Sequence, residues 1–225
     1  MKHYGDITKL HGYDLPPVDC ITGGSPCQDL SVAGKREGLS GERSGLFMEQ
    51  IRIVKEMRER DIANGRSGQF VRPRWLVWEN VPGALSSGKN ENGQPCKGAD
   101  FQAVLTEIVR IVEPNAPPVP MPNKGKWSKS GCIYDEMGRW SIAWRVHDAQ
   151  FWGATQEVDG RVLNRGTPQR RKRIALVADF GSGVGAAEVL FERNGLQGNP
   201  QTEPTERERV AGSAEESTGE SDQSG

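Results

Sequence analysis

Cysteine and histidine are scarce in this chain, and neither is spaced as a metal-binding or disulfide framework. The 225 residues include 3 His and four cysteines: Cys20, Cys27, Cys96 and Cys132. No two of these cysteines have the CxxC spacing of a zinc site or the regular spacing of a disulfide-rich secreted domain. We therefore expect reduced thiols in a cytosolic protein and no metal ligand among the histidines.

Long apolar runs are also missing. No run approaches the ~20 residues that span a bilayer, and the residues after Met1 do not form a signal peptide. Hydrophobic residues make up 35% and charged residues 26%, with 28 Gly and 14 Pro. Such a composition is typical of a polar, loop-rich globular protein, and the length suffices for one sizeable domain with a core. We expect no membrane partner.

The chain has almost no net charge, but its charges are unevenly distributed. The formal net charge is -1, and residues 197–225 carry seven acidic and two basic side chains. The preceding residues carry 27 Lys or Arg against 23 Asp or Glu, a mildly basic balance that suits a nucleic-acid partner without identifying one. Because residues 196–225 are nearly devoid of apolar side chains, we expect a disordered acidic tail after a domain at 1–195.

Hydrophobic periodicity predicts alternating strands and helices in the first half of the chain. Apolar runs at 18–21 and 75–78 indicate buried strands, and spacings of three and four predict helices from residue 44 to about 61 and at 103–112. This alternation favours an α/β fold with a parallel sheet covered on both faces.

The remaining segments are less regular. Residues 3–8 resemble a strand end that runs into a loop, as if the first elements of a domain were missing. Residues 113–140 are rich in Pro, Gly and Lys without a clear period, which predicts an exposed insertion. Two further strands are predicted at 142–146 and 173–177, with a hairpin or loop at 155–165 between them.

A glycine turn places one cysteine where a ligand could reach it. Thr22-Gly23-Gly24-Ser25-Pro26-Cys27-Gln28 follows the first strand, and Glu79 follows the second. Ligands of parallel α/β sheets bind at the carboxyl ends of the strands, so both residues are candidate site residues. Cys27 is either a reactive thiol or a small buried hydrophobe. Residues 29–45 are either a mobile active-site loop or a passive surface loop.

Three blocks occur in order along the chain: Gly24-Ser25-Pro26-Cys27-Gln28, Glu79-Asn80-Val81 and Pro168-Gln169-Arg170-Arg171-Lys172-Arg173. Together they resemble the Pro-Cys-Gln, Glu-Asn-Val and Gln-x-Arg-x-Arg motifs of the DNA (cytosine-5)-methyltransferase family. The resemblance runs from about residue 5 to 180. The residues at 29–31 and 177–180 are similar to those of phage and prophage members of the family. It implies a Rossmann-like, S-adenosylmethionine-dependent methyltransferase domain that lacks its first strand or strands.

The resemblance also implies roles for individual residues. Cys27 would add to C6 of a flipped-out cytosine in double-stranded DNA, with Glu79 at N3 and the exocyclic amine. Arg173, with Arg171 beside it, would bind the cytosine O2. The S-adenosylmethionine contacts would come from three residues: Asp6, Ile7 and Pro26. The DNA or base contacts would come from five: Gln28, Ser31, Arg43, Asn80 and Gln169.

The chain departs from the family pattern in its cofactor and recognition segments. It contains no Phe-x-Gly-x-Gly segment, no acidic residue for the ribose and no target-recognition domain after the basic block. We therefore expect a catalytic segment that is inactive alone or depends on a separate polypeptide carrying the missing half. Two alternatives stay open: a non-catalytic remnant that binds DNA weakly, and a pyrimidine enzyme of the thymidylate synthase type. Glu79 could also be a plain surface carboxylate, and the basic block could touch only phosphates.

Overall fold

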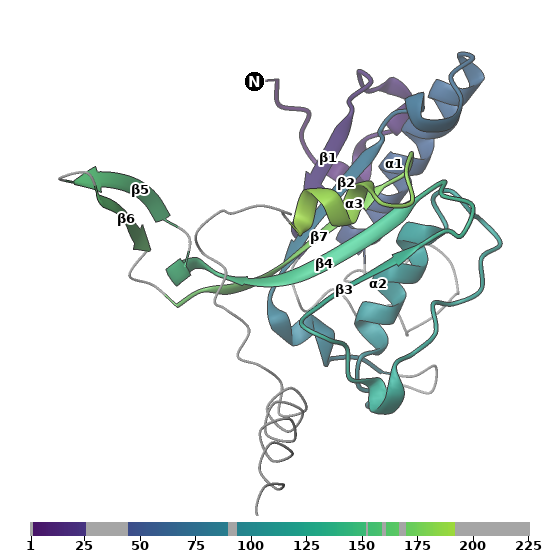
Figure 1. Cartoon of the computed structure of the whole chain (residues 1–225). Coiled ribbons are helices and arrows are strands. Elements are labelled where there is room, and N and C mark those ends of the chain that lie inside the picture. Colours follow the sequence, from purple (N-terminus) through teal and green to yellow (C-terminus); the bar gives the residue numbers. More distant parts are fainter. Residues whose placement is uncertain are drawn as a thin grey trace, which may run out of the picture.

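The computed structural model describes residues 2–25, 45–89, 94–151, 153–158, 161–166 and 170–191 (Figure 1). The strands are β1 (Cys20–Gly23), β2 (Trp75–Asn80), β3 (Ser130–Tyr134), β4 (Ser141–Asp148), β5 (Gly153–Val158), β6 (Arg161–Gly166) and β7 (Lys172–Asp179). The α-helices are α1 (Gly45–Ala63), α2 (Ala99–Val109) and α3 (Gly185–Leu190). No described helix is both long enough and apolar enough to cross a membrane.

Five strands form one mixed sheet in the order β1-β2-β7-β4-β3. β1 and β2 are parallel, whereas β7 runs antiparallel to both β2 and β4, and β3 runs antiparallel to β4. The predicted α/β class is confirmed and fits part of a Rossmann-like methyltransferase domain, but the prediction of a parallel sheet holds for one strand pair only. One edge of the sheet therefore collects the carboxyl ends of β1, β2 and β4 and the amino ends of β7 and β3.

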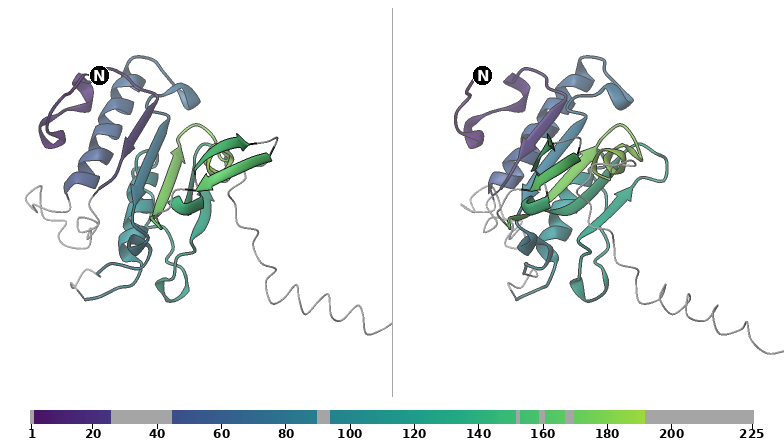
Figure 2. Two further views of the ribbon diagram at one scale, coloured as in Figure 1. Left: turned by 90° about the vertical axis from the view of Figure 1, so that its left-hand side faces the viewer. Right: turned by 60° about the vertical axis from the view of Figure 1, so that its left-hand side comes forward.

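The sheet is the middle layer of three (Figure 2). Helices α1 and α2 pack on one face around a large core that contains Trp78 and Phe101, and α3 covers part of the other face through a small cluster around Val177 and Ala186. Strand β2 serves both layers, because Leu76 and Trp78 point to the α1 side and Trp75 and Val77 to the α3 side.

The predicted helices form because their apolar residues recur once per turn. Phe47, Ile51, Val54 and Met57 of α1 are buried, as the periodicity predicts. Helix α2 begins four residues before the predicted start, directly after Gly98, whose φ of 80° is readily adopted only by glycine. The predicted strands at 142–146 and 173–177 correspond to β4 and β7, and β5 and β6 form the hairpin that was one of two alternatives at 155–165.

The structure differs from the sequence interpretation in three segments. Strand β1 alternates between exposed and half-buried residues instead of being buried, because it is the outermost strand of the sheet and has a neighbour on one side only. Residues 3–8 contain a 3-10 helix, Ile7–Lys9, and no strand. The predicted exposed insertion at 113–140 contributes β3 to the sheet and Trp127 to the edge of the core. The predicted tail, 196–225, lies outside the described residues.

Candidate functional site

The end of β1 is fastened to the end of β2. The Asn80 side-chain amide donates to the Ser25 carbonyl at 2.9 Å, and the indole N–H of Trp78 donates to the Ser25 hydroxyl at 3.1 Å. Trp78 is fully buried, and only 4% of Asn80 is exposed. These two bonds fix the residue that directly precedes Pro26 and Cys27, so they determine where the chain leaves the sheet toward the candidate nucleophile.

Glu79 and Arg173 form an ion pair at the same edge. The Arg173 Nε and Glu79 Oε1 atoms lie 2.7 Å apart, and the side chains are 33% and 50% exposed. Antiparallel pairing of β2 with β7 places Glu79 opposite Ala175, so Arg173 is its diagonal neighbour on the same face. An ion pair this exposed contributes little to stability. Its two charged groups therefore remain accessible to a ligand.

The glycine turn brings the backbone close to this carboxylate. A Cβ atom on Gly24 would lie 3.1 Å from Glu79 Oε2, tighter than ordinary van der Waals contact. A side chain at this position would press on the Glu79 carboxylate. Gly24 therefore allows the backbone after β1 to approach Glu79 closely, three residues before Cys27 in the sequence.

The basic block at the start of β7 is held through its backbone. The Arg171 N–H donates to Asp148 Oδ1 at 3.2 Å, and the Arg171 carbonyl accepts from Ala149 N–H at 3.0 Å. The side chains of Arg170 and Arg171 are exposed. The structure thus brings Arg171 to the site edge without giving it the contact with Glu79 that Arg173 makes.

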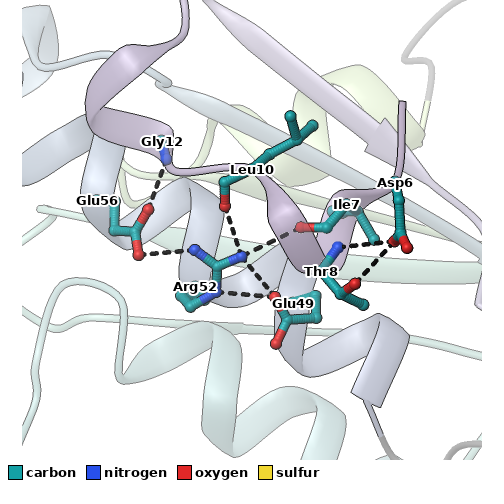
Figure 3. A network of polar contacts seen from close by, with 8 residues as sticks. All are labelled: Asp6, Ile7, Thr8, Leu10, Gly12, Glu49, Arg52 and Glu56. Atoms are coloured by element: carbon teal, nitrogen blue, oxygen red, sulfur yellow. Dashed lines mark hydrogen bonds and ion pairs between the residues drawn. The ribbon is translucent and has the colours of Figure 1, made fainter. Parts of the chain in front are cut away.

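The N-terminal segment is clamped onto α1 by Arg52 (Figure 3). Its guanidinium donates to the carbonyls of Ile7 and Leu10 at 3.2 and 2.8 Å. On the helix side, Arg52 forms ion pairs at 2.5 and 2.8 Å with two carboxylates, those of Glu49 and Glu56. The Ile7 carbonyl is therefore engaged internally, which leaves its side chain and N–H for any cofactor contact.

Asp6 is exposed and caps the 3-10 helix Ile7–Lys9. Its Oδ1 accepts from the Thr8 N–H at 3.0 Å and from the Thr8 hydroxyl at 2.9 Å, and these bonds hold the pKa of Asp6 below its ordinary value. Both bonds go to Oδ1, and Asp6 is exposed, so Oδ2 can accept from an external donor.

The structure describes only part of the predicted site. It brings together the end of β1, Glu79, Asn80 and Arg173, with Arg171 nearby. The predicted residues that lie outside the described ones are Pro26, Cys27, Gln28, Ser31, Arg43 and Gln169. Asn80, for which a DNA contact is predicted, is 4% exposed, and its amide donates to the Ser25 carbonyl.

Sequence reasoning missed two buried residues beside this site. Trp78 was assigned to the core but not to the Ser25 bond. Gln50 of α1 is 6% exposed, and its Nε2 has no partner among the described residues. A Cβ on Gly23 would lie 2.6 Å from both polar atoms of Gln50. The one sequence signal that could have found Gln50 is a polar residue within the apolar face of a predicted helix.

The chain is similar in sequence to one protein family and to several known proteins. Residues 1–98 match the C-5 cytosine-specific DNA methylase family. The chain is 32% identical over 216 residues to a protein of Escherichia phage P1 named DNA N-6-adenine-methyltransferase, covering 88% of the chain and 25% of that protein. It is 34% identical over 179 residues to Type II methyltransferase M.NgoBV of Neisseria gonorrhoeae, covering 80% and 29%.

A third relative extends over a similar range. Type II methyltransferase M.BsuFI of Bacillus subtilis is 28% identical over 199 residues, which cover 88% of the chain and 32% of that protein. The chain thus spans between a quarter and a third of the length of these relatives. The matched segment contains the glycine turn, Glu79 and Asn80. Through it, the chain is similar to the C-5 cytosine-specific DNA methylase family.

Proposed function

We propose that this chain is the catalytic segment of a DNA cytosine-5 methyltransferase, which methylates C5 of a flipped-out cytosine through a covalent Cys27–C6 adduct. The observation that carries the proposal is the exposed Glu79–Arg173 pair, 2.7 Å apart, beside the anchored end of β1. An acceptor and a donor at one sheet edge suit a polar aromatic ring, and the anchored Ser25 stands two residues before Cys27 in the sequence.

The chemistry explains why these residue types occur together. The Cys27 thiolate adds to C6, and the electron pair of the C5–C6 bond moves so that C5 becomes nucleophilic. The bound S-adenosylmethionine supplies the methyl group that C5 acquires. A base then removes the C5 proton, the C5–C6 double bond reforms, and the carbon–sulfur bond breaks to release the Cys27 thiolate.

Glu79 and Arg173 contact opposite ends of the ring edge. The Glu79 carboxylate accepts from the exocyclic amine and from a protonated N3, a pattern that cytosine offers and thymine does not. Arg173 donates to O2 and stabilises the negative charge that builds on the ring during thiolate addition. Their mutual ion pair holds both groups in place before the base arrives.

S-adenosylmethionine fits the N-terminal segment in one respect that the structure allows us to test. The Oδ2 of Asp6 can accept from the exocyclic amine of an adenine, and the clamp by Arg52 fixes the backbone that follows Asp6. Asp6, Ile7 and Pro26 would hold one side of the cofactor. The chain has no Phe-x-Gly-x-Gly segment, so we propose that a polypeptide carrying that segment completes the site.

Kinetics of two variants test the roles of the pair, in a reaction mixture that contains this completing polypeptide. Glu79→Gln keeps the shape but cannot favour a protonated N3, so the maximal rate should fall about 10²-fold or more. Arg173→Ala should cost about 2.7–4 kcal/mol of transition-state stabilisation. If Arg173 only touches phosphate, the loss will appear in DNA affinity and vanish at saturating DNA, which would contradict its proposed role.

The name of the phage P1 relative supports a second candidate, an adenine-N6 methyltransferase. Transfer to an exocyclic amine needs no thiolate addition, so it would leave Cys27 without a chemical role. Nucleoside analysis of methylated DNA separates the two, because the proposal requires 5-methylcytosine. N6-methyladenine as the product would refute it. DNA binding without any methylation in the completed mixture would favour the remnant that the sequence left open.

A further inference from the structure

A basic cavity lies at the same sheet edge as the candidate site, on the α2 side. It encloses about 600 Å³, and its lining includes Trp127, Val146 and four lysines, which are Lys97, Lys126, Lys129 and Lys172. All four lysines are exposed. They come from the start of α2, from the segment that precedes β3, and from the start of β7, so the fold gathers them from distant parts of the sequence.

Two glycines hold the lysine-bearing segments against each other. A Cβ on Gly98 would lie 2.5 Å from the Gly125 carbonyl oxygen, and one on Gly125 would clash with the Lys97 carbonyl oxygen. The Trp127 indole N–H then donates to the Gly98 carbonyl at 2.8 Å. Lys97 and Lys126 are therefore presented from a closely packed backbone on either side of Trp127.

The third lysine is fixed by the sheet. The Lys129 carbonyl accepts from the Val146 N–H at 2.8 Å, and the neighbouring Ser128 carbonyl accepts from the Trp144 indole at 3.1 Å. Trp127 also packs edge-on against Trp144, with ring centroids 6.0 Å apart. The backbone that carries these cations is thus fixed by four hydrogen-bonded or aromatic contacts, unlike an ordinary surface loop.

Cations outnumber acidic groups among the described residues that line this cavity. Among the described residues that line it, the one acidic residue is Asp148, which is 8% exposed and accepts from the Gln150 and Arg171 N–H groups. None of the four lysines has an ion pair within the described part of the chain. Arg145 and His147 also line the cavity and engage in interactions of their own.

A second cavity at the opposite edge of the sheet shows the usual arrangement. It encloses about 770 Å³, and three of its four lining cations have an acidic partner, whereas the fourth, Arg58, is buried and donates to the Val71 and Pro73 carbonyls. The pairs are Lys55 with Glu107, Arg66 with Asp61 and Arg139 with Glu113. Among the described residues, the exposed lysines of the basic cavity therefore differ from the cations of this second cavity, which are either paired with a carboxylate or buried against carbonyls.

The basic cavity meets the candidate site across the first residues of β7. Lys172 lines the cavity, and the next residue, Arg173, pairs with Glu79. Successive side chains of a strand point to opposite faces, so β7 contributes Lys172 to the basic cavity and Arg173 to the candidate site. Pairing of Lys172 with Asp148 and of Arg173 with His147 continues this junction onto β4.

We propose that the basic cavity binds the phosphate backbone of duplex DNA next to the target base, with Lys126 and Lys129 each neutralising a phosphate. This rests on the proposed function, which makes DNA the substrate. Lysine ammonium groups bind phosphates without reading sequence. The apolar surface of Trp127 and Val146 suits the deoxyribose between neighbouring phosphates. The cavity thereby fixes the register of the duplex relative to the Glu79–Arg173 pair.

The salt dependence of duplex binding tests this with a matched control. Lys126→Gln/Lys129→Gln removes two charges at the basic cavity, and Lys55→Gln/Arg66→Gln removes two at the opposite cavity. Binding of a fluorescent duplex is measured against monovalent salt for the unaltered chain and both variants. Each lost phosphate contact reduces the slope of log K against log salt by about 0.9, so the first variant should lose about 1.8 and the second close to zero.

The outcomes separate this inference from the function on which it rests. Equal slope losses in the two variants, or no loss in the first, would overturn the basic cavity as the DNA site while leaving a DNA substrate intact. Failure of the unaltered chain to bind any duplex at low salt, both alone and with the completing polypeptide, would overturn both the inference and the proposed function. Tighter binding of single-stranded RNA than of the duplex, with the same slope loss, would identify RNA as the occupant and overturn the proposal.

Discussion

Replacement of Asn80 by alanine should destabilise the protein by about 2 kcal/mol. The side chain makes two good hydrogen bonds, from its amide to the Ser25 carbonyl at 2.9 Å and from the Val81 N–H to its Oδ1 at 2.8 Å. Each bond contributes about 1 kcal/mol net, and unpaired groups left in a buried place cost more. Ser25 and Val81 are half-buried. Water can therefore reach them in part, which keeps the expected loss near 2 kcal/mol.

Urea denaturation followed by tryptophan fluorescence measures this change in the free energy of unfolding. In a thermal scan the same loss corresponds to about 4–8 °C in a domain of this size. Asn64→Ala is the matched control, because Asn64 is exposed and a surface substitution changes stability by about 0.5 kcal/mol or less. If Asn80→Ala were as stable as this control, the hydrogen bonds of Asn80 would not stabilise the junction of β1 and β2, and the reasoning would be refuted.

Three further predictions follow from single contacts. Arg74→Met leaves the fully buried Asp179 carboxylate without its partner at 2.8 Å and should cost about 3 kcal/mol in urea denaturation, with a loss below about 1 kcal/mol as the contrary result. Burial, with a neighbouring arginine, lowers the pKa of His147 below 6.5, so the free energy of unfolding should fall as the pH drops through that lowered pKa. His147→Gln should flatten this fall in denaturation curves recorded against pH, and identical pH profiles for the two proteins would contradict the prediction. Gly24→Ala should displace the Glu79 carboxylate and slow methyl transfer at unchanged melting temperature, whereas an unchanged rate would refute the close approach.

The sequence predicted the parts of the fold that depend on local periodicity. Buried positions repeat once per turn in α1, and the run of apolar residues in β2 is continuous, so both elements follow from the chain itself. The location of Glu79 at the sheet edge follows from where β2 stops. The same reasoning correctly placed Glu79 next to the turn after β1, because parallel strands end at one edge.

Features that depend on long-range pairing could not be predicted in this way. Nothing in residues 172–179 distinguishes an antiparallel strand from a parallel one. Strand β7 lies between β2 and β4 because it pairs with both, and these pairings join distant parts of the sequence. The segment before β3 looked like an exposed insertion because its Pro, Gly and Lys residues hide the packing of Trp127. That packing depends on the close approach of Gly98 and Gly125, which the sequence does not reveal.

The site shows the same division. Residue types and order indicated a cysteine, a carboxylate and an arginine, but not that Asn80 would turn inward and hold Ser25. An Asn beside an exposed Glu at a strand end looks like a ligand contact. The strand alternation that exposes Glu79 necessarily buries its neighbour, and this consequence of the pleat could have been drawn from the sequence.

Trapping with a fluorinated substrate tests the central claim most directly. Duplex DNA containing 5-fluorocytosine is incubated with the chain, S-adenosylmethionine and a polypeptide that carries a Phe-x-Gly-x-Gly segment, and the adduct is mapped by mass spectrometry. Fluorine at C5 blocks the final elimination, so sulfur remains bonded to C6. We predict one adduct, on Cys27, that Cys27→Ser abolishes. An adduct on Cys20, Cys96 or Cys132, or methyl transfer to ordinary DNA without any adduct on the fluorinated duplex, would contradict the account.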